Sequence, residues 1–88
     1  MDHKKSDQNH VLREIHNSKE LILRELDVNM QQQTVLKNRI STIKDYARVI
    51  GKDDPQYKTL FNQVRNDQIT LEQLRIRQQA LNQKLSRY

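Results

Sequence analysis

The sequence predicts an all-α fold, an antiparallel hairpin of two long coiled-coil helices. Apolar residues recur three and four positions apart from Leu12 to Ile50 and again from Tyr57 to Tyr88, the spacing of a helix that buries one stripe. The repeat is interrupted once, at residues 51–55, where the single Gly and the single Pro of the 88 residues lie. A short turn between two such repeats makes the helices antiparallel neighbours.

The first helix is expected over residues 10–50, and residues 1–9 are expected to be a flexible polar tail because they lack the apolar repeat. Residues 10–88 then form a single helical-hairpin domain. The repeat defines a seam, the stripe of a and d positions that faces the other helix. In the first helix the seam consists of Leu12, Ile15, Lys19, Ile22, Leu26, Asn29, Gln33, Leu36, Ile40, Ile43, Ala47 and Ile50.

The turn is expected over residues 51–54 and the second helix over 55–87. Gly51 is suited to end the first helix, because Gly adopts the left-handed conformation without a Cβ penalty. Asp54 is suited to cap the second helix, and Pro55 to occupy its first position, where a missing N–H costs nothing. The second seam consists of Tyr57, Leu60, Val64, Asp67, Leu71, Leu74, Gln78, Leu81, Leu85 and Tyr88.

When the two seams are folded together about the turn, apolar residues meet apolar residues along most of their length. The same alignment places Asn29 opposite Gln78, so these two amides are expected to hydrogen-bond to each other rather than remain unpaired. Asp67 falls beside Arg39, which predicts a contact between a guanidinium and a carboxylate at the edge of the seam. A polar pair inside a seam commonly costs stability and fixes alignment.

Some apolar residues find no partner within one hairpin. The first helix is longer than the second, so Leu12 and Ile15 are expected to overhang its end. A second stripe, at the c positions of the first helix, lies away from the seam. We call it the outer stripe; its members are Leu21, Val28, Val35, Thr42 and Val49. In the second helix Ile69 and Ile76 occupy f positions, which would face water.

These uncovered residues predict protein–protein interaction. The expected partner is a second copy, most simply in a dimer of hairpins that forms a four-helix bundle, or else a different helical protein that completes the bundle. The predicted function is that of an adaptor, chaperone or assembly subunit. The predicted interaction residues are Leu12, Ile15, Leu21, Val28, Val35, Val49, Ile69 and Ile76.

The charge pattern leaves a second interpretation open. The net charge is +5, and after Glu72 the chain contains basic residues but no acidic ones. Cations at the C-terminal end of a helix complement its macrodipole. The same residues are candidate contacts to an acidic partner, and the alternative function is that of a basic helical nucleic-acid-binding protein. The candidate contacts are Arg75, Arg77, Lys84 and Arg87.

Nothing in the sequence predicts catalysis. Cysteine is absent, and the serines have no neighbouring His or carboxylate arranged as a nucleophile and its base. His16 and Glu20 have the spacing of metal ligands, but the interpretation favoured here is a pair of solvated side chains. We therefore expect no enzyme activity, no cofactor and no metal. No apolar run suggests a signal peptide or a membrane span, which favours a cytoplasmic protein, with export that needs no cleaved signal as the alternative.

Overall fold

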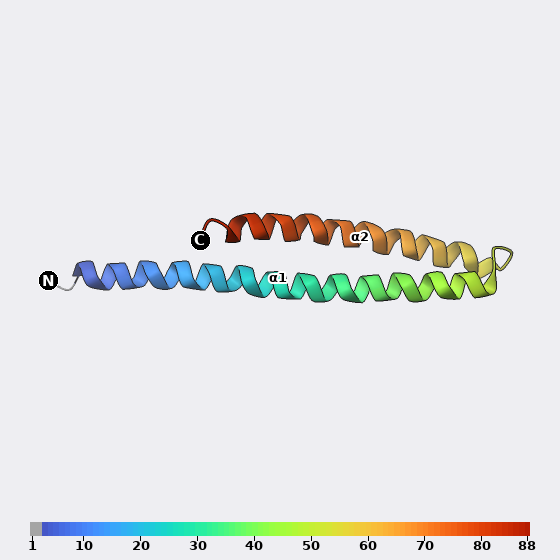
Figure 1. The fold of residues 1–88 in the computed structure, drawn as a ribbon, viewed down its shortest axis with the longest axis horizontal. Coiled ribbons are helices and arrows are strands. Elements are labelled where there is room, and N and C mark those ends of the chain that lie inside the picture. The colour runs from blue at the N-terminus through green and yellow to red at the C-terminus, as the bar shows by residue number, and fades with distance from the viewer. Residues whose placement is uncertain (1–2) are drawn as a thin grey trace.

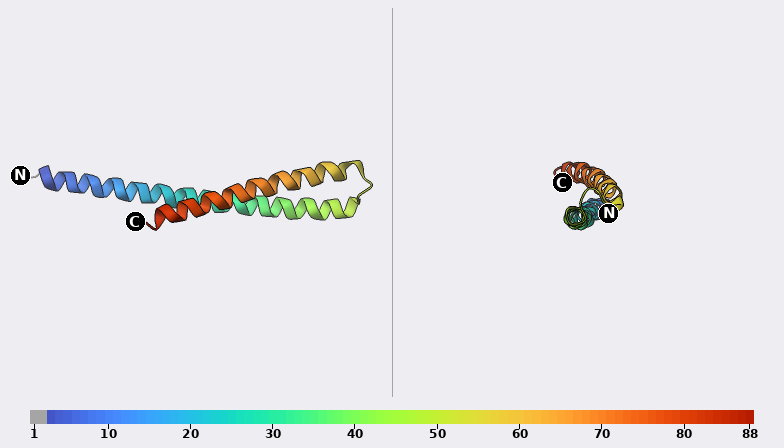
Figure 2. Two further views of the ribbon diagram at one scale, coloured as in Figure 1. Left: turned by 90° about the horizontal axis from the view of Figure 1, so that it is seen from above. Right: turned by 90° about the vertical axis from the view of Figure 1, so that its right-hand side faces the viewer.

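The computed structural model describes the backbone of residues 3–88 and the side chains of residues 12–88. It contains two helices, α1 (His3–Ile50) and α2 (Pro55–Leu85). The helices lie side by side and antiparallel, in a rod that measures 79 × 15 × 15 Å (Figure 1). Viewed from above, they cross one another along their length (Figure 2). The predicted antiparallel hairpin is confirmed.

The two outer helix ends differ from their predicted positions. Helix α1 begins at His3 rather than at residue 10. The residues before the apolar repeat include no Gly or Pro, so nothing in their sequence stops a helical backbone from extending through them. Helix α2 ends at Leu85 rather than at residue 87, and the N–H of Ser86 donates to the carbonyl of Asn82 at 3.0 Å. The flexibility of residues 1–9 stays a prediction.

The turn has the chemistry that the sequence predicts. Gly51 has a φ of 82°, in the left-handed region, and its N–H donates to the carbonyl of Ala47 at 3.0 Å. Asp54 is the N-cap of α2, and its Oδ1 accepts from the N–H of Gln56 at 2.8 Å. Pro55 follows in the first turn. Each helix end at the turn therefore has a partner for at least one backbone group that the helix itself leaves unpaired.

Every seam residue from Ile22 to Ile50 and from Tyr57 to Leu85 is buried or half-buried. The largest cluster, which we call the apolar core, lies in the half of the hairpin nearer the turn, and Ile43 and Leu74 pack against it. Leu81, in the other half, is the most deeply buried side chain, with 1% of its surface exposed. The apolar core consists of Leu36, Ile40, Val64 and Leu71.

Candidate interaction surfaces

A group of buried and half-buried amides, which we call the polar layer, interrupts the seam between the apolar core and Leu81. It consists of Asn29, Gln33 and Gln78. Gln33 Nε2 donates to Asn29 Oδ1 at 2.6 Å and to Gln78 Oε1 at 2.9 Å. Asn29 Nδ2 donates to the carbonyl oxygen of Leu74 at 2.9 Å. The direct pairing of Asn29 with Gln78 was therefore the wrong connection, because Gln33 lies between them and bridges the two helices.

The contact predicted between Arg39 and Asp67 is confirmed. Arg39 Nε donates to Asp67 Oδ2 at 2.7 Å, and Nη2 donates to Oδ1 at 2.6 Å. The Asp67 carboxylate is buried in the seam, whereas the Arg39 side chain is half exposed. The hydrogen bonds to Asp67 and its negative charge raise the pKa of Arg39. A bidentate ion pair of this kind fixes the alignment of the two helices, because both hydrogen bonds are lost if one helix slides along the other.

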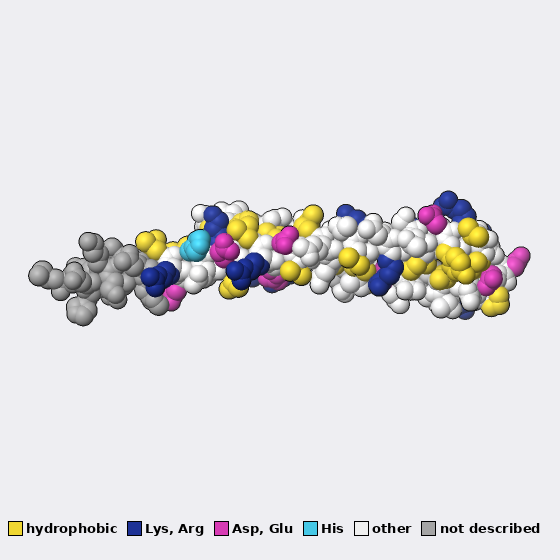
Figure 3. All heavy atoms as spheres, turned by 90° about the horizontal axis from the view of Figure 1, so that it is seen from below, with side chains coloured by type: hydrophobic (Ala, Val, Ile, Leu, Met, Phe, Trp, Pro, Cys, Tyr) yellow, Lys and Arg dark blue, Asp and Glu magenta, His cyan; other side chains and the backbone are white. Residues whose placement is uncertain are grey.

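The outer stripe is uncovered in the hairpin. Its four aliphatic members are each at least half exposed, and Thr42 is exposed as well. A helix turns by about 100° per residue, so the c positions lie roughly 130° around α1 from the centre of the seam, out of reach of α2. Seen from the side of α1, hydrophobic side chains appear as separate patches along the rod (Figure 3). Ile69 and Ile76 on α2 are also exposed.

The overhang of α1 is also uncovered. Helix α1 continues well past the C-terminal end of α2 (Figure 1). Leu12 and Ile15 lie on this segment, and both are exposed although they continue the same a/d repeat. The structure thus separates the predicted interaction residues into three places: the outer stripe, the overhang and the far side of α2. It does not bring them together into one patch.

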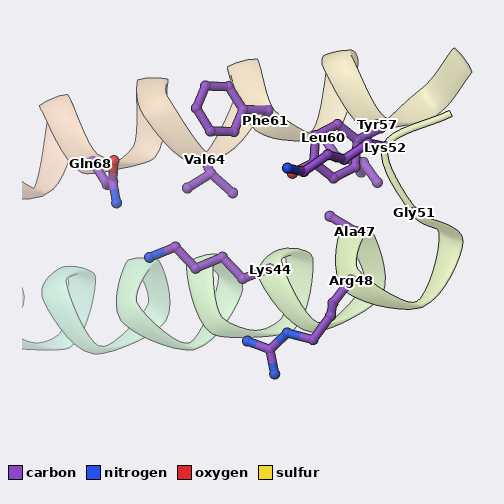
Figure 4. A pocket seen from close by; sticks show the side chains of 10 residues that line it. All are labelled: Lys44, Ala47, Arg48, Gly51, Lys52, Tyr57, Leu60, Phe61, Val64 and Gln68. Atoms are coloured by element: carbon purple, nitrogen blue, oxygen red, sulfur yellow. The ribbon is translucent and has the colours of Figure 1, made fainter. Parts of the chain in front are cut away.

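A groove at the turn end of the hairpin was not predicted. It has a volume of about 490 Å³, and its apolar lining comes largely from α2. Phe61 is half exposed beside this groove, and the guanidinium of Arg65 lies over its ring at 5.8 Å from the centroid. In Figure 4 the side chain of Arg48 runs away from α2, while Lys44 extends between the helices. The lining also includes Lys52, so three cations adjoin an apolar surface.

One signal in the sequence would have pointed to this groove. Phe61 is the single Phe of the chain and occupies an e position, directly beside the seam rather than in it. Large side chains at positions that flank a seam widen the surface between two helices. Only the a, d, c and f positions entered the sequence-based prediction, so the e positions of both helices were left out.

The four basic residues predicted to meet an acidic partner fall into two groups. Arg77 Nη2 pairs with Glu25 Oε1 at 2.7 Å, and Arg75 lies 3.8 Å from Glu72. Lys84 and Arg87 form no ion pair with any residue that the structure describes. Of the four candidate contacts, Arg75 and Arg77 therefore lie beside carboxylates of the hairpin, whereas Lys84 and Arg87 do not.

Comparison with known proteins adds no relative: the sequence matches no family model, no curated protein and no solved structure. Within the side chains that the structure describes, no three His, Cys, Asp or Glu residues gather in a way that would hold a metal ion. Neither helix, over its described residues, has an apolar stretch that would cross a lipid bilayer.

Proposed function

We propose that this chain is a non-enzymatic helical interaction module that acts as an adaptor, chaperone or assembly subunit in the cytoplasm. It associates with itself or completes a bundle with another helical protein. The observation that carries this proposal is the outer stripe, in which four aliphatic side chains and Thr42 recur every seven residues from Leu21 to Val49 and are exposed. Single exposed aliphatic residues are common, but an aligned row of them marks an interaction surface.

The remaining surfaces support interaction more than catalysis. The groove at the turn end is lined by apolar side chains and cations, and its lining contains neither a His nor a carboxylate that would act as a base. The overhang adds a second uncovered segment that continues the seam, with Leu12 and Ile15 exposed. A partner helix that packed there would extend an existing helix–helix interface.

The proposal is tested with the double variant Val28→Glu with Val35→Glu, which places two charges on the outer stripe. We expect the wild-type chain to form a concentration-independent oligomer in sedimentation equilibrium, and the variant to lose that assembly while circular dichroism shows that its helicity is kept. The matched control is Asn66→Glu with Gln73→Glu, because it adds the same charge at the same seven-residue spacing on exposed positions of α2.

Each result has a separate meaning for the proposal. If the stripe variant assembles like the wild type, the outer stripe is not an interaction surface and the proposal loses its main support. If the wild type is a poorly helical monomer, the stripe awaits a different helical protein rather than a second copy. If the control variant loses assembly equally, the effect comes from net charge and not from the stripe.

Nucleic-acid binding competes with this proposal but has less support. The arginines that would form a basic band across the two helices include Arg39, Arg75 and Arg77, and each of them lies beside a carboxylate. Affinity for a mixed oligonucleotide that falls steeply between low and physiological salt would favour the competing function. Absence of binding at low salt would remove it.

A further inference from the structure

We infer that the outer stripe binds a second copy of this chain, with α1 packed antiparallel on α1 and a two-fold axis passing at Val35. This inference rests on the proposed self-association and specifies its geometry. The stripe is symmetric about Val35, so residues equidistant from it in the two copies face each other. Val28 then faces Thr42 of the second copy, and Leu21 faces Val49 of the second copy.

The charges beside the stripe complement each other in this arrangement. Arg24 and Asp45 each lie three residues after a stripe residue, so they occupy the same flank, and they are nearly equidistant from Val35. A two-fold axis between antiparallel helices brings matching flanks together, so Arg24 faces Asp45 of the second copy, and the pair occurs twice. Both side chains are exposed and make no ion pair with the described residues. Farther around the helix, Glu20 and Arg48 also share one side and are nearly equidistant from Val35, so Glu20 lies on the same side as Arg48 of the second copy.

The opposite flank presents no unmatched charge. Glu25 and Arg39 lie on that side of the stripe, and each is already paired within its own hairpin. Their partners, Arg77 and Asp67, come from α2. The second copy therefore meets a neutralised flank on one side and a complementary flank on the other, which favours association in this orientation.

Other orientations and alignments fit less well. A parallel pair would bring opposite flanks together with the same residue numbers level, so Arg24 would lie far along the helices from Asp45 of the second copy. It would also align the two helix macrodipoles unfavourably. Sliding an antiparallel pair by one heptad leaves one end of the stripe uncovered. In either direction the slide also moves Arg24 by about 10 Å along the helices away from Asp45 of the second copy.

The position of the stripe also specifies the shape of the assembly. In a square four-helix bundle the two neighbours of each helix lie about 90° apart around it. Here the outer stripe lies roughly 130° from the seam, so α2 and the second copy's α1 flank α1 at a wider angle. The four helices then form an open, curved layer with the two copies of α1 at its centre.

Cysteine cross-linking tests the alignment, because the natural chain contains no Cys. Val35→Cys lies on the two-fold axis and is expected to form a disulfide-linked dimer on mild oxidation. Val28→Cys alone is not, because its two copies would lie about 21 Å apart along the helices, whereas a disulfide needs Cα atoms within about 7 Å. A mixture of Val28→Cys and Thr42→Cys chains is expected to give the mixed dimer, recognised by its mass.

The outcomes separate this inference from the proposed function. If Val28→Cys links to itself, the pair is parallel or differently aligned, and the inference is overturned. If the wild type is a dimer by sedimentation but none of the stripe variants cross-links more than the α2 control Asn66→Cys, self-association stands and this interface is wrong. A wild-type chain that is monomeric at every concentration would overturn both the inference and self-association.

Charge reversal gives a second test that needs no oxidation. Arg24→Asp and Asp45→Arg are each expected to weaken the homodimer roughly tenfold, because each variant brings like charges together twice. An equimolar mixture of the two variants restores both opposite-charge pairs and is expected to dimerise within about twofold of the wild type. Failure of the mixture to recover would overturn the proposed pairing of Arg24 with Asp45.

Discussion

The half of the hairpin next to the turn and the half next to the open end share one heptad repeat but fill it differently. Next to the turn, the seam holds the apolar core and is closed by the cap at Asp54. Toward the open end, the seam passes through the polar layer, then Leu81, and then continues on α1 alone, with Leu12 exposed. The half next to the turn supplies most of the apolar burial and the Arg39–Asp67 pair, whereas the open half supplies the polar layer and an uncovered end.

This difference shows how two helices with a regular heptad repeat can pack in a single alignment. Apolar seams tolerate sliding by one heptad, because Leu, Ile and Val replace one another at little cost. The polar layer does not tolerate it, since a slide would leave the buried amides of Asn29 and Gln33 without partners. The apolar core thus stabilises the hairpin, while the polar layer and the Arg39–Asp67 pair specify its alignment.

The largest expected effect separates the covered seam from the uncovered seam. Leu36→Ala removes a side chain from the apolar core and is expected to lower the free energy of unfolding by about 2–5 kcal/mol. Leu12→Ala removes the same atoms from the overhang and is expected to change it by less than about 0.5 kcal/mol. Chemical denaturation at a fixed protein concentration measures both. An equal loss in the two variants would mean that the overhang is covered in solution.

The next largest expected effect is the loss of stability when the ion pair of each half is broken. Arg39→Gln leaves the buried carboxylate of Asp67 without its guanidinium, so we expect a clear fall in melting temperature, smaller than that of Leu36→Ala. The control is Arg77→Gln at the open end, where both partners are half exposed and the loss is expected to stay below about 1 kcal/mol. Equal falls would show that burial of Asp67 does not matter. Thermal unfolding followed by circular dichroism measures the difference.

Substitutions in the polar layer are expected to lower or to raise the free energy of unfolding, depending on whether Gln33 is kept. Asn29→Leu with Gln78→Leu leaves the buried amide of Gln33 without either of its acceptors, and is expected to lower the free energy of unfolding by about 1–3 kcal/mol. Adding Gln33→Leu removes that orphaned group and is expected to restore or exceed the wild-type stability. Thermal unfolding gives the ranking, and sedimentation shows whether the triple variant loses its single assembly state. A double variant more stable than the wild type would contradict the bridging role of Gln33.

Whether a feature of this hairpin could be predicted from the sequence depends on the kind of interaction that forms it. The turn was predicted residue by residue, because Gly51, Asp54 and Pro55 act through local backbone chemistry. The pairing of Arg39 with Asp67 was predicted from heptad position alone. The bridge through Gln33 was not, because heptad position brings several amides together and does not say which rotamers they adopt.

Two further features of the structure were not predicted, for different reasons. The start of α1 at His3 was missed because apolar periodicity reports which residues are buried, and a helix continues past its buried part where no residue breaks it. The groove was missed because Phe61 occupies an e position, and the predicted surfaces were taken from the a, d, c and f positions. The surfaces left uncovered by one hairpin were identified from position, but what covers them depends on a second chain.

The smallest expected effect concerns the turn and asks whether it determines the fold or only connects the helices. A Cβ on Gly51 would meet no atom within 4 Å, so Gly51→Ala acts only through its left-handed backbone, with an expected loss of about 1 kcal/mol. Gly51→Asn is expected to lose less, because Asn tolerates this conformation. Denaturation ranks the two variants.

Since the polar layer and the Arg39–Asp67 pair fix alignment on their own, both Gly51 variants are expected to keep the antiparallel pairing and the assembly state of the wild type. A domain-swapped dimer of Gly51→Ala, with α1 and α2 opened into one long helix, would contradict that expectation. In that case the left-handed turn, and not the seam, would decide that the chain folds back on itself.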